Sequence, residues 1–269
     1  MKKMALLLLA ALPMVFTSCG EDEEEPIDPI NISLGISQVG VDFKKTYQLE
    51  CNIDGVTYSS DDPFVATVDQ AGLVTGKHVG TTKVKASRDG YSTAVTVTVQ
   101  PVNTNFTMPI LSWGADMNRI KSLVEEDKNM QPVELSPEEA KTTLGYTTNG
   151  LLPGYTYNFE DNKLKSAGLQ VTEEMGDNDY LVTDGNNVGF LNQYYQYYGD
   201  QDTSMFFCNA DDPKNATVLV EMEYDPKGFY YVYWAENKGT KTRATGVICP
   251  EDFDPYRAAA REVVKATRK

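Results

Sequence analysis

The stretch YSSDDPFVATVDQAGLVTGKHVGTTKVKAS, residues 58–87, decides the fold of the first part of the chain. We expect the apolar Val65 and Val68 to face the core. Asp69 and Gly72 fit a tight hairpin turn, because glycine adopts a positive φ without steric cost. The stretch therefore predicts short, half-buried strands joined by tight turns.

The same kind of pattern continues on both sides of this stretch. Apolar and polar residues alternate in TYQLEC (46–51), TKVKAS (82–87) and AVTVTV (94–99). Side chains along a strand point to opposite faces in turn, so this alternation indicates half-buried strands. About seven such strands within residues 32–100 predict a small all-β sandwich.

The stretch also carries a known order of residues: an aromatic, serines, a proline, then V-A-x-V-D-x-x-G-x-V-x-G and G-T. The chain supplies this pattern at Ser59, Ser60, Pro63, Val65, Ala66, Val68, Asp69, Gly72, Val74, Gly76, Gly80 and Thr81. On these residues, 32–99 resembles the group 2 bacterial immunoglobulin-like domain. Tyr58 stands where the family usually has tryptophan, which keeps an aromatic residue in the core. The resemblance implies an immunoglobulin-like sandwich of a kind found in surface adhesins and as spacers beside functional modules, and we expect a spacer here.

Two residues of this first domain are candidates for chemistry. Cys51 has no cysteine near Val84 with which to form the antibody-type disulfide, so we expect it to act as a small buried apolar group. His78 is the only histidine and lies in an expected turn. A single histidine without clustered partners predicts a surface residue and not a metal ligand.

The N-terminus has the layout of a secretory signal. Lys2 and Lys3 give residues 1–18 a positive start, and the apolar run that follows is shorter than the roughly 20 residues of a membrane span. Small residues then precede Cys19, and this arrangement resembles a bacterial lipoprotein signal. The resemblance implies that the Cys19 thiol carries a lipid that anchors the protein in the outer membrane. An ordinary secreted protein with a coincidental cysteine is the alternative.

A run of acids, residues 21–25, lies in the linker 19–31 that follows this cysteine. Like charges repel one another and keep such a run extended. The run resembles the acidic export tag of surface-displayed lipoproteins in some Gram-negative phyla, which implies exposure at the cell surface. A plain solvated tether is the alternative.

Acidic residues dominate the charge of the whole chain. Its 39 Asp and Glu outnumber 24 Lys and Arg, which gives a formal net charge of −15. Such a surface repels phosphate backbones, so we expect no nucleic-acid partner. Hydrophobic residues make up 41% of the chain, enough to build folded cores, and the length suggests about two domains.

The pattern changes to α+β after a polar, proline-containing boundary, and we expect a second domain over 105–269. Helical spacing or capping signals predict helices at 113–127, 136–145, 187–199 and 254–269. Alternation and turn residues predict a hairpin over 155–171 and strands at 205–208, 216–224 and 229–235. Helix then hairpin occurs twice, which suggests a degenerate tandem repeat with an antiparallel sheet. In element order it resembles the repeats of β-lactamase-inhibitor-like proteins, which bind other proteins across a concave sheet.

The last of these helices is amphipathic. One apolar stripe holds Tyr256, Ala259, Ala260, Val263, Val264 and Thr267. We expect this helix to dock on the sheet; a helix that binds a membrane surface or a partner is the alternative.

Clustered aromatic residues are the best functional lead. They lie in YYQYY (194–198) and FYYVYW (229–234). Alternate residues of a strand face opposite sides, so Tyr230 and Trp234 share one face, whereas Tyr197 falls off the expected helical stripe. Exposed rings of this kind stack on sugars or anchor protein partners, which makes Tyr197, Tyr230 and Trp234 the candidate ligand-binding residues. Filling of the core is the alternative for the clusters as a whole.

Chemistry beyond binding has little support in the sequence. No hydrolase, zinc-protease, phosphate-loop or EF-hand motif is present, and one histidine does not supply a catalytic triad outside the first domain. Asp177 and Asp179 are candidates for calcium in an acidic loop that is more simply solvated. Cys208 and Cys249 are a candidate disulfide. We expect no catalytic residue, no metal and no cofactor.

These observations predict a multidomain, non-enzymatic surface lipoprotein. An immunoglobulin-like spacer would present an α+β domain, with an antiparallel sheet, that recognises a glycan or a protein. A structural subunit of an envelope assembly is the alternative, and a glycosidase that uses paired carboxylates is the least favoured.

Overall fold

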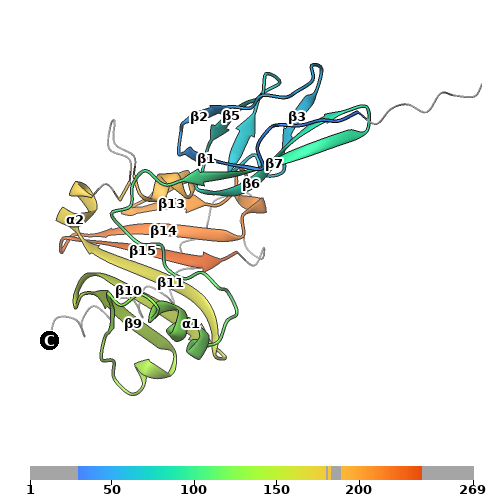
Figure 1. Ribbon diagram of the computed structural model, residues 1–269. Coiled ribbons are helices and arrows are strands. Elements are labelled where there is room, and N and C mark those ends of the chain that lie inside the picture. Colours follow the sequence, from blue (N-terminus) through green and yellow to red (C-terminus); the bar gives the residue numbers. More distant parts are fainter. Residues whose placement is uncertain (1–29, 180, 183–188, 238–269) are drawn as a thin grey trace, which may run out of the picture. The chain divides into compact units, whose positions relative to one another are not determined.

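The computed structural model describes residues 30–179, 181–182 and 189–237 (Figure 1). The signal, Cys19 and the acidic run therefore lie outside the described residues, as does the expected C-terminal helix. Within the described part of the chain, no helix reaches the length and hydrophobicity of a transmembrane span. Strands account for most of the regular structure (Figure 1).

The first domain is a sandwich of two small sheets. One sheet has the order β1-β7-β6-β3, and the other has the order β2-β5-β4. The strands are β1 Gln38–Asp42, β2 Thr46–Gln48, β3 Thr57–Ser60, β4 Ala66–Val68, β5 Leu73–Gly76, β6 Gly80–Arg88 and β7 Tyr91–Gln100. β1 pairs in parallel with β7, and the other pairs are antiparallel. The predicted immunoglobulin-like class is confirmed.

Alternation places the core of this sandwich where the sequence predicts it. On β7, Val95, Val97 and Val99 are buried, and the threonines between them turn outward or sit half-buried. Tyr58 fills the centre and lies against the turn at Gly72, whose φ is +82°. A Cβ on Gly72 would come within 3.0 Å of the Tyr58 ring, so only glycine allows this close approach.

Two expectations for this domain are wrong. Cys51 lies just beyond the edge strand β2, where it is a free thiol of intermediate exposure and not a buried apolar group. His78 is buried and not a surface residue. Its ring stacks on Phe64 at a centroid distance of 3.9 Å and hydrogen-bonds the Phe64 carbonyl at 2.8 Å.

The second domain is built on one eight-stranded antiparallel sheet. Its order is β12-β13-β14-β15-β11-β10-β9-β8. The strands are β8 Met130–Pro132, β9 Thr143–Thr148, β10 Leu151–Glu160, β11 Lys163–Thr172, β12 Gln196–Gln201, β13 Ser204–Cys208, β14 Val218–Asp225 and β15 Phe229–Glu236. The helices are α1 Met117–Val124 and α2 Glu173–Asn178, with short 3-10 turns η1 Glu139–Lys141, η2 Leu191–Gln193 and η3 Pro213–Asn215.

The topology has two halves of four consecutive strands. β8 to β11 form one meander, β12 to β15 form the other, and their last strands, β11 and β15, pair at the centre. A helix precedes the strands in each half, which is the element order expected of the tandem repeat. The repeat itself and its likeness to inhibitor-like proteins stay predictions.

The two faces of this sheet differ in composition. Face A is the side that bears Tyr155, Tyr157, Leu169, Val232 and Trp234, and α1 packs on it through Ile120 and Val124. Face B is the opposite side. Its apolar cluster holds Phe206, Cys208, Ala216, Leu219, Tyr231, Tyr233 and Ala235.

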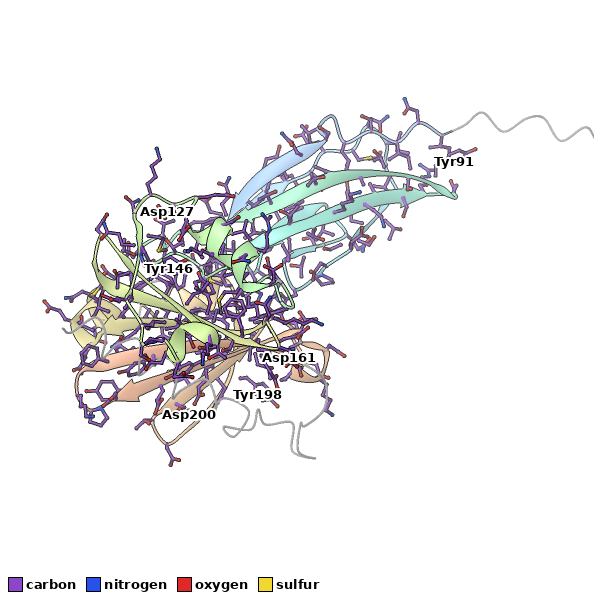
Figure 2. All side chains as sticks on the ribbon, turned by 90° about the horizontal axis from the view of Figure 1, so that it is seen from below. Tyr91, Asp127, Tyr146, Asp161, Tyr198 and Asp200 are labelled. Atoms are coloured by element: carbon purple, nitrogen blue, oxygen red, sulfur yellow. The ribbon has the colours of Figure 1, made fainter. Side chains whose placement is uncertain are left out.

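Two predicted helices of this domain do not form as expected. In 136–145 the capping box is present, since Ser136 and Glu139 bond each other, but only the short η1 follows. The β-branched residues that come next enter β9, which ends the helix early. In the described part of 187–199, η2 is followed directly by β12, the edge strand that carries Tyr198 and Asp200 (Figure 2).

Candidate functional site

A buried glutamine joins the first domain, the linker and the second domain. Gln193 in η2 is fully buried, and its carbonyl oxygen accepts a 2.6 Å hydrogen bond from the Val79 backbone N–H. Its side-chain oxygen accepts from the N–H groups of Val102 and Asn103 at 2.9 and 3.0 Å, and its amide donates to the Asn103 carbonyl. These bonds hold η2 beside residues 77–79, which connect β5 to β6.

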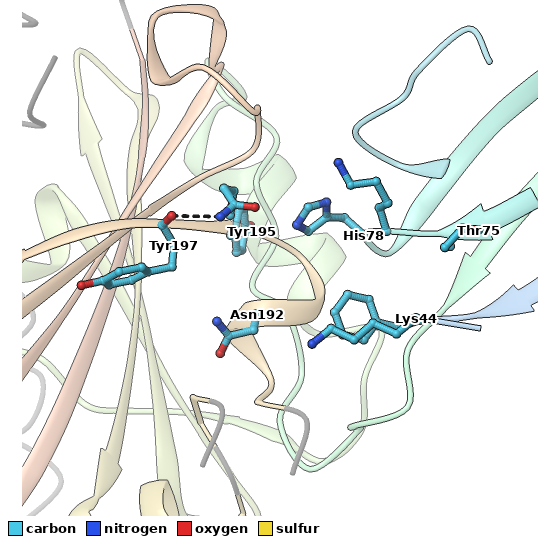
Figure 3. Close-up of a pocket in the computed structure, with 10 residues that line it drawn as sticks. Lys44, Thr75, His78, Asn192, Tyr195 and Tyr197 are labelled. Atoms are coloured by element: carbon cyan, nitrogen blue, oxygen red, sulfur yellow. Dashed lines mark hydrogen bonds between the residues drawn. The ribbon is translucent and has the colours of Figure 1, made fainter. Parts of the chain in front are cut away.

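A cavity of about 520 Å³ lies at this junction (Figure 3). Segments 43–44 and 75–78 line one side, and Asn192 with residues 195–197 line the other. Figure 3 shows Lys44 and His78 on one side of the gap and Asn192, Tyr195 and Tyr197 on the other. The Gln196 side chain donates to the Tyr197 carbonyl at 3.1 Å, which fixes the backbone at this wall.

Tyr197 is the predicted ligand-binding residue that reaches this cavity. Its side chain is 40% exposed, and its ring meets the edge of Phe207 at a centroid distance of 5.7 Å. The hydroxyl stays protonated at neutral pH, since burial and then the nearby Asp200 carboxylate raise its pKa. Because Phe207 holds this exposed ring in place, the ring is suited to stacking against a ligand such as a sugar.

Two lysines give the cavity a positive character. Lys44 lies in the left-handed region at φ 60°, with its ammonium 5.2 Å from the centre of the Phe43 ring. The Lys77 ammonium is 3.4 Å from the Asp211 carboxylate, and both side chains are partly solvent-accessible, so this ion pair is weak and does not prevent Lys77 from binding a ligand. The described residues that line the cavity include no Asp or Glu. Sequence reasoning missed both lysines, and nothing near them in the sequence marks them.

His78 closes the first-domain side of the cavity as a neutral ring. Burial lowers its pKa, and the hydrogen bond that the ring donates to the Phe64 carbonyl opposes that effect without cancelling it. At neutral pH the ring therefore offers hydrogen bonding without charge.

Trp234 does not belong to an exposed platform. It is fully buried in the core of face A, where the Tyr195 hydroxyl lies at its side. Alternation along β15 puts it there, since its cross-strand partner Ala167 is also a core residue. The prediction that Trp234 contacts a ligand is therefore wrong.

Tyr230 is half-buried and engaged within the domain. Its hydroxyl donates to Asp177 at 3.0 Å, and its ring packs so closely on Gly176 that a Cβ there would clash. Burial, with Asp177 beside it, raises the pKa of Tyr230 to about 12, so the hydroxyl remains a donor. The structure brings Tyr230 to α2 and not to the cavity, so it is not part of the candidate site.

The remaining candidates concern metals and cysteines. In the described part of the chain, no three His, Cys, Asp or Glu residues group into a metal-binding arrangement. Asp177, a calcium candidate, instead accepts the bond from Tyr230. Cys208 is a free, buried thiol that donates to the Ala210 carbonyl at 3.2 Å, and Cys249 lies outside the described residues, so their disulfide stays a prediction.

Comparisons with known proteins agree with this architecture only in part. No curated protein is significantly similar in sequence to the chain. Among solved structures, an intimin mutant from EHEC O157:H7 is 16% identical and aligns over 41% of this chain and 75% of its own, with a TM-score of 0.21. Domains 5–6 of the S-layer protein SbsC are 17% identical over 80% and 86% of the two chains, with a TM-score of 0.20.

A SusE-like surface-located polysaccharide-binding protein from Bacteroides thetaiotaomicron is 12% identical. It aligns over 76% of this chain and 33% of its own, with a TM-score of 0.22. TM-scores this low carry no argument about the whole chain. The family comparison is the specific one: residues 41–99, with the sandwich observed here, match the bacterial Ig-like domain (group 2).

Proposed function

We propose that this protein is a non-enzymatic lipoprotein of the cell surface that binds a carbohydrate bearing an acidic group in the cavity at Tyr197. The observation that carries the proposal is the combination of an exposed tyrosine ring, side-chain amides and two lysines around one cavity. A bacterial Ig-like domain supports an extracellular or surface setting.

Each part of the cavity matches one part of such a ligand. The apolar face of a sugar ring stacks on an aromatic ring, here Tyr197. Side-chain amides donate to and accept from hydroxyl groups, which Asn192 and Gln196 supply at the same wall. Lys44 and Lys77 would attract a carboxylate or sulfate of the carbohydrate.

The negative net charge of the chain makes the two cavity lysines important for binding an anionic ligand. The formal net charge of −15 repels an anionic ligand at long range. Two cations without an acid among the described lining residues create a local exception to that repulsion. Binding should therefore depend on these two side chains and should weaken as salt screens them.

The N-terminal part of the proposal rests on the sequence. The signal layout, Cys19 and the acidic run support lipid anchoring and surface display. Protease added to intact cells should degrade the protein, and survival until the outer membrane is broken would contradict surface display.

Binding is tested with the full-length protein and a panel of neutral, uronic-acid-containing and sulfated oligosaccharides. Tyr197→Ala should weaken binding of an acidic member of the panel at least about tenfold, since stacking on an aromatic side chain is lost. Tyr91→Ala is the matched control, because Tyr91 is similarly exposed, at 38%, but starts β7 and is not among the residues that line the cavity.

A second set of variants tests whether the cavity lysines are needed for binding acidic sugars. Lys44→Gln with Lys77→Gln should remove the preference for acidic over neutral sugars, whereas Lys83→Gln, an exposed lysine of β6, should leave it unchanged. Equal binding of all variants, or binding of no oligosaccharide by the folded protein, would reject the carbohydrate proposal. Release of shortened products during prolonged incubation would reject the non-enzymatic part.

A further inference from the structure

The connection between the two domains is tied to the second domain at several points. Asn103 is 7% exposed, and its side-chain amide donates to the Asp179 carbonyl at 3.0 Å. The side-chain amide of Asn105 donates to the same carbonyl at 3.1 Å. Phe106 is buried in the face A cluster, where its ring meets that of Phe190 at a centroid distance of 5.5 Å. Linkers between independently moving domains are exposed and cross few contacts, and this connection differs from them.

Gln193 is the residue that fastens this connection. Its side-chain amide pairs with the backbone of Asn103 in both directions: the oxygen accepts from the N–H at 3.0 Å, and the nitrogen donates to the carbonyl. The same oxygen accepts from the Val102 N–H at 2.9 Å. An amide supplies both a donor and an acceptor, whereas a carboxylate only accepts. Gln193 therefore serves the connection as the backbone of a neighbouring strand would.

The same residue also holds the first domain. The main-chain carbonyl of Gln193 accepts from the Val79 N–H at 2.6 Å, and Val79 directly follows the cavity residue His78. The ion pair between Lys77 and Asp211 is a second, weaker contact between the domains. The bonds of Gln193 are made away from water, since the residue has no exposed area, and a buried polar group that loses its partner is costly.

Gln193 does not line the cavity, but it lies between residues that do. Asn192 precedes it, and Tyr195 and Tyr197 follow it in one wall, whereas His78 belongs to the opposite wall (Figure 3). Movement of η2 away from the first domain would separate the ring of Tyr197 from the two lysines of the cavity. The geometry of the whole site therefore depends on a residue that does not reach the ligand.

We propose that Gln193 is the positioning residue of the carbohydrate site and that it locks the immunoglobulin-like domain and the second domain into one binding unit. The first domain is then half of the site and not a spacer. The effect on ligand binding rests on the proposed function, whereas the locking of the two domains is independent of any ligand. A cavity that is preformed in this way binds more tightly, because less conformational freedom is lost when the ligand enters.

Nitrogen-15 relaxation of the unaltered full-length protein tests the locking without a variant. Domains that move together share one rotational correlation time, whereas domains on a flexible linker have separate and shorter ones. We expect one value for the amides of β7 in the first domain and of β15 in the second. Separate correlation times for the two strands would overturn the proposal.

Hydrogen exchange in a pair of variants tests the part played by Gln193. Gln193→Ala removes the side-chain bonds to the connection, and Gln170→Ala is the matched control. Gln170 is also a buried glutamine of the second domain, but it lies on β11 and donates to the Tyr231 hydroxyl. The backbone amides of Val102 and Asn103 should exchange at least about tenfold faster in Gln193→Ala than in Gln170→Ala, because their acceptor is lost.

Oligosaccharide binding by the same two variants separates positioning from a general loss of stability. Neither glutamine lines the cavity. Gln193→Ala should nevertheless weaken binding of the acidic oligosaccharide at least about tenfold, while Gln170→Ala leaves it unchanged. If Gln193→Ala does not fold, Gln193→Glu takes its place with the same expectations, since it keeps the size and the acceptor of the side chain and loses only the donor.

The outcomes distinguish this proposal from the proposed function. Equal exchange or equal binding in the Gln193 and Gln170 variants overturns the role of Gln193. If the unaltered protein binds no oligosaccharide, the proposed function is rejected, and relaxation and hydrogen exchange alone then decide whether Gln193 locks the two domains together.

Discussion

The cores of the two domains are built from different kinds of side chain. In the sandwich, β-branched residues such as Val95 and Val97 fill the core beside two buried aromatic residues, Phe43 and Tyr58. In the second domain, the core holds many large rings, among them Tyr155, Tyr157 and Trp234. The first core therefore depends on close backbone approaches at tight turns, and the second depends on the volume of single side chains.

The largest expected loss of stability is in the core of the second domain. Trp234→Ala removes the most voluminous of the fully buried side chains and leaves a cavity in the core. It should lower the free energy of unfolding by about 3–5 kcal/mol. Both tryptophans, Trp113 and Trp234, lie in the second domain, so Trp113 still reports its unfolding by fluorescence in guanidinium chloride. A loss of less than about 1 kcal/mol would mean that this core tolerates lost volume and that the contrast is false.

A smaller effect is expected from a turn of the first domain. Gly72→Ala combines a positive φ with a Cβ that meets the Tyr58 ring and the Leu49 carbonyl at 3.0 Å, and should cost about 2–3 kcal/mol. Gly90→Ala is the matched control, with φ +83° but open space around the added Cβ, and should cost about 1 kcal/mol.

Two spectroscopic signals distinguish unfolding of the first domain from unfolding of the second in the Gly72→Ala and Gly90→Ala variants. The loss should appear in the circular dichroism of unfolding, while the tryptophan fluorescence, which reports only the second domain, should shift little. If the two glycine variants are equally stable, crowding against Tyr58 does not matter and the first core is looser than we infer.

The smallest expected effect is on the pH dependence of stability, through His78 beside the cavity. Because burial lowers the folded-state pKa of His78, the unfolded chain binds the proton first as the pH falls. The stabilising contribution is therefore complete above the unfolded pKa of about 6.5 and is lost as the pH falls toward the folded value. Between pH 7.5 and 5.5, the unaltered protein should lose more stability than His78→Gln, by less than about 1 kcal/mol, because the hydrogen bond to Phe64 offsets part of the effect of burial on the pKa.

Thermal unfolding at the two pH values measures this difference for both proteins. The many carboxylates contribute to both and cancel in the comparison. An identical pH dependence in the variant would mean that His78 titrates at its ordinary value and that the ring is not held neutral by its surroundings.

The sequence predicted most strands because strand patterning is local. The alternation in β7 and in β15 is visible residue by residue, and the structure follows it. Helices were predicted less well, because an aromatic spacing of three and four residues also suits a 3-10 turn followed by a strand. Phe190, Leu191 and Tyr195 are buried on face A through η2, which leaves Tyr197 outside.

The candidate site was predictable at one residue only. Tyr197 stood out because it fell off the stripe, and it is the exposed one. Lys44, Lys77 and His78 come from loops of the other domain, and no local pattern connects residues that meet only in the folded chain. The burial of His78 depends on stacking with Phe64, a tertiary contact that spacing does not reveal.

The central pairing of β11 with β15 has a consequence for how the chain folds. Every other pair in the eight-stranded sheet joins strands that follow each other in the sequence, so each meander closes through short loops. The β11–β15 pairing, such as Thr172 with Phe229, must close a loop of roughly 60 residues at an entropic cost of about 3–4 kcal/mol. We expect the two meanders to form quickly and to join in a slower step, so that destabilising this seam slows refolding more than weakening a hairpin does.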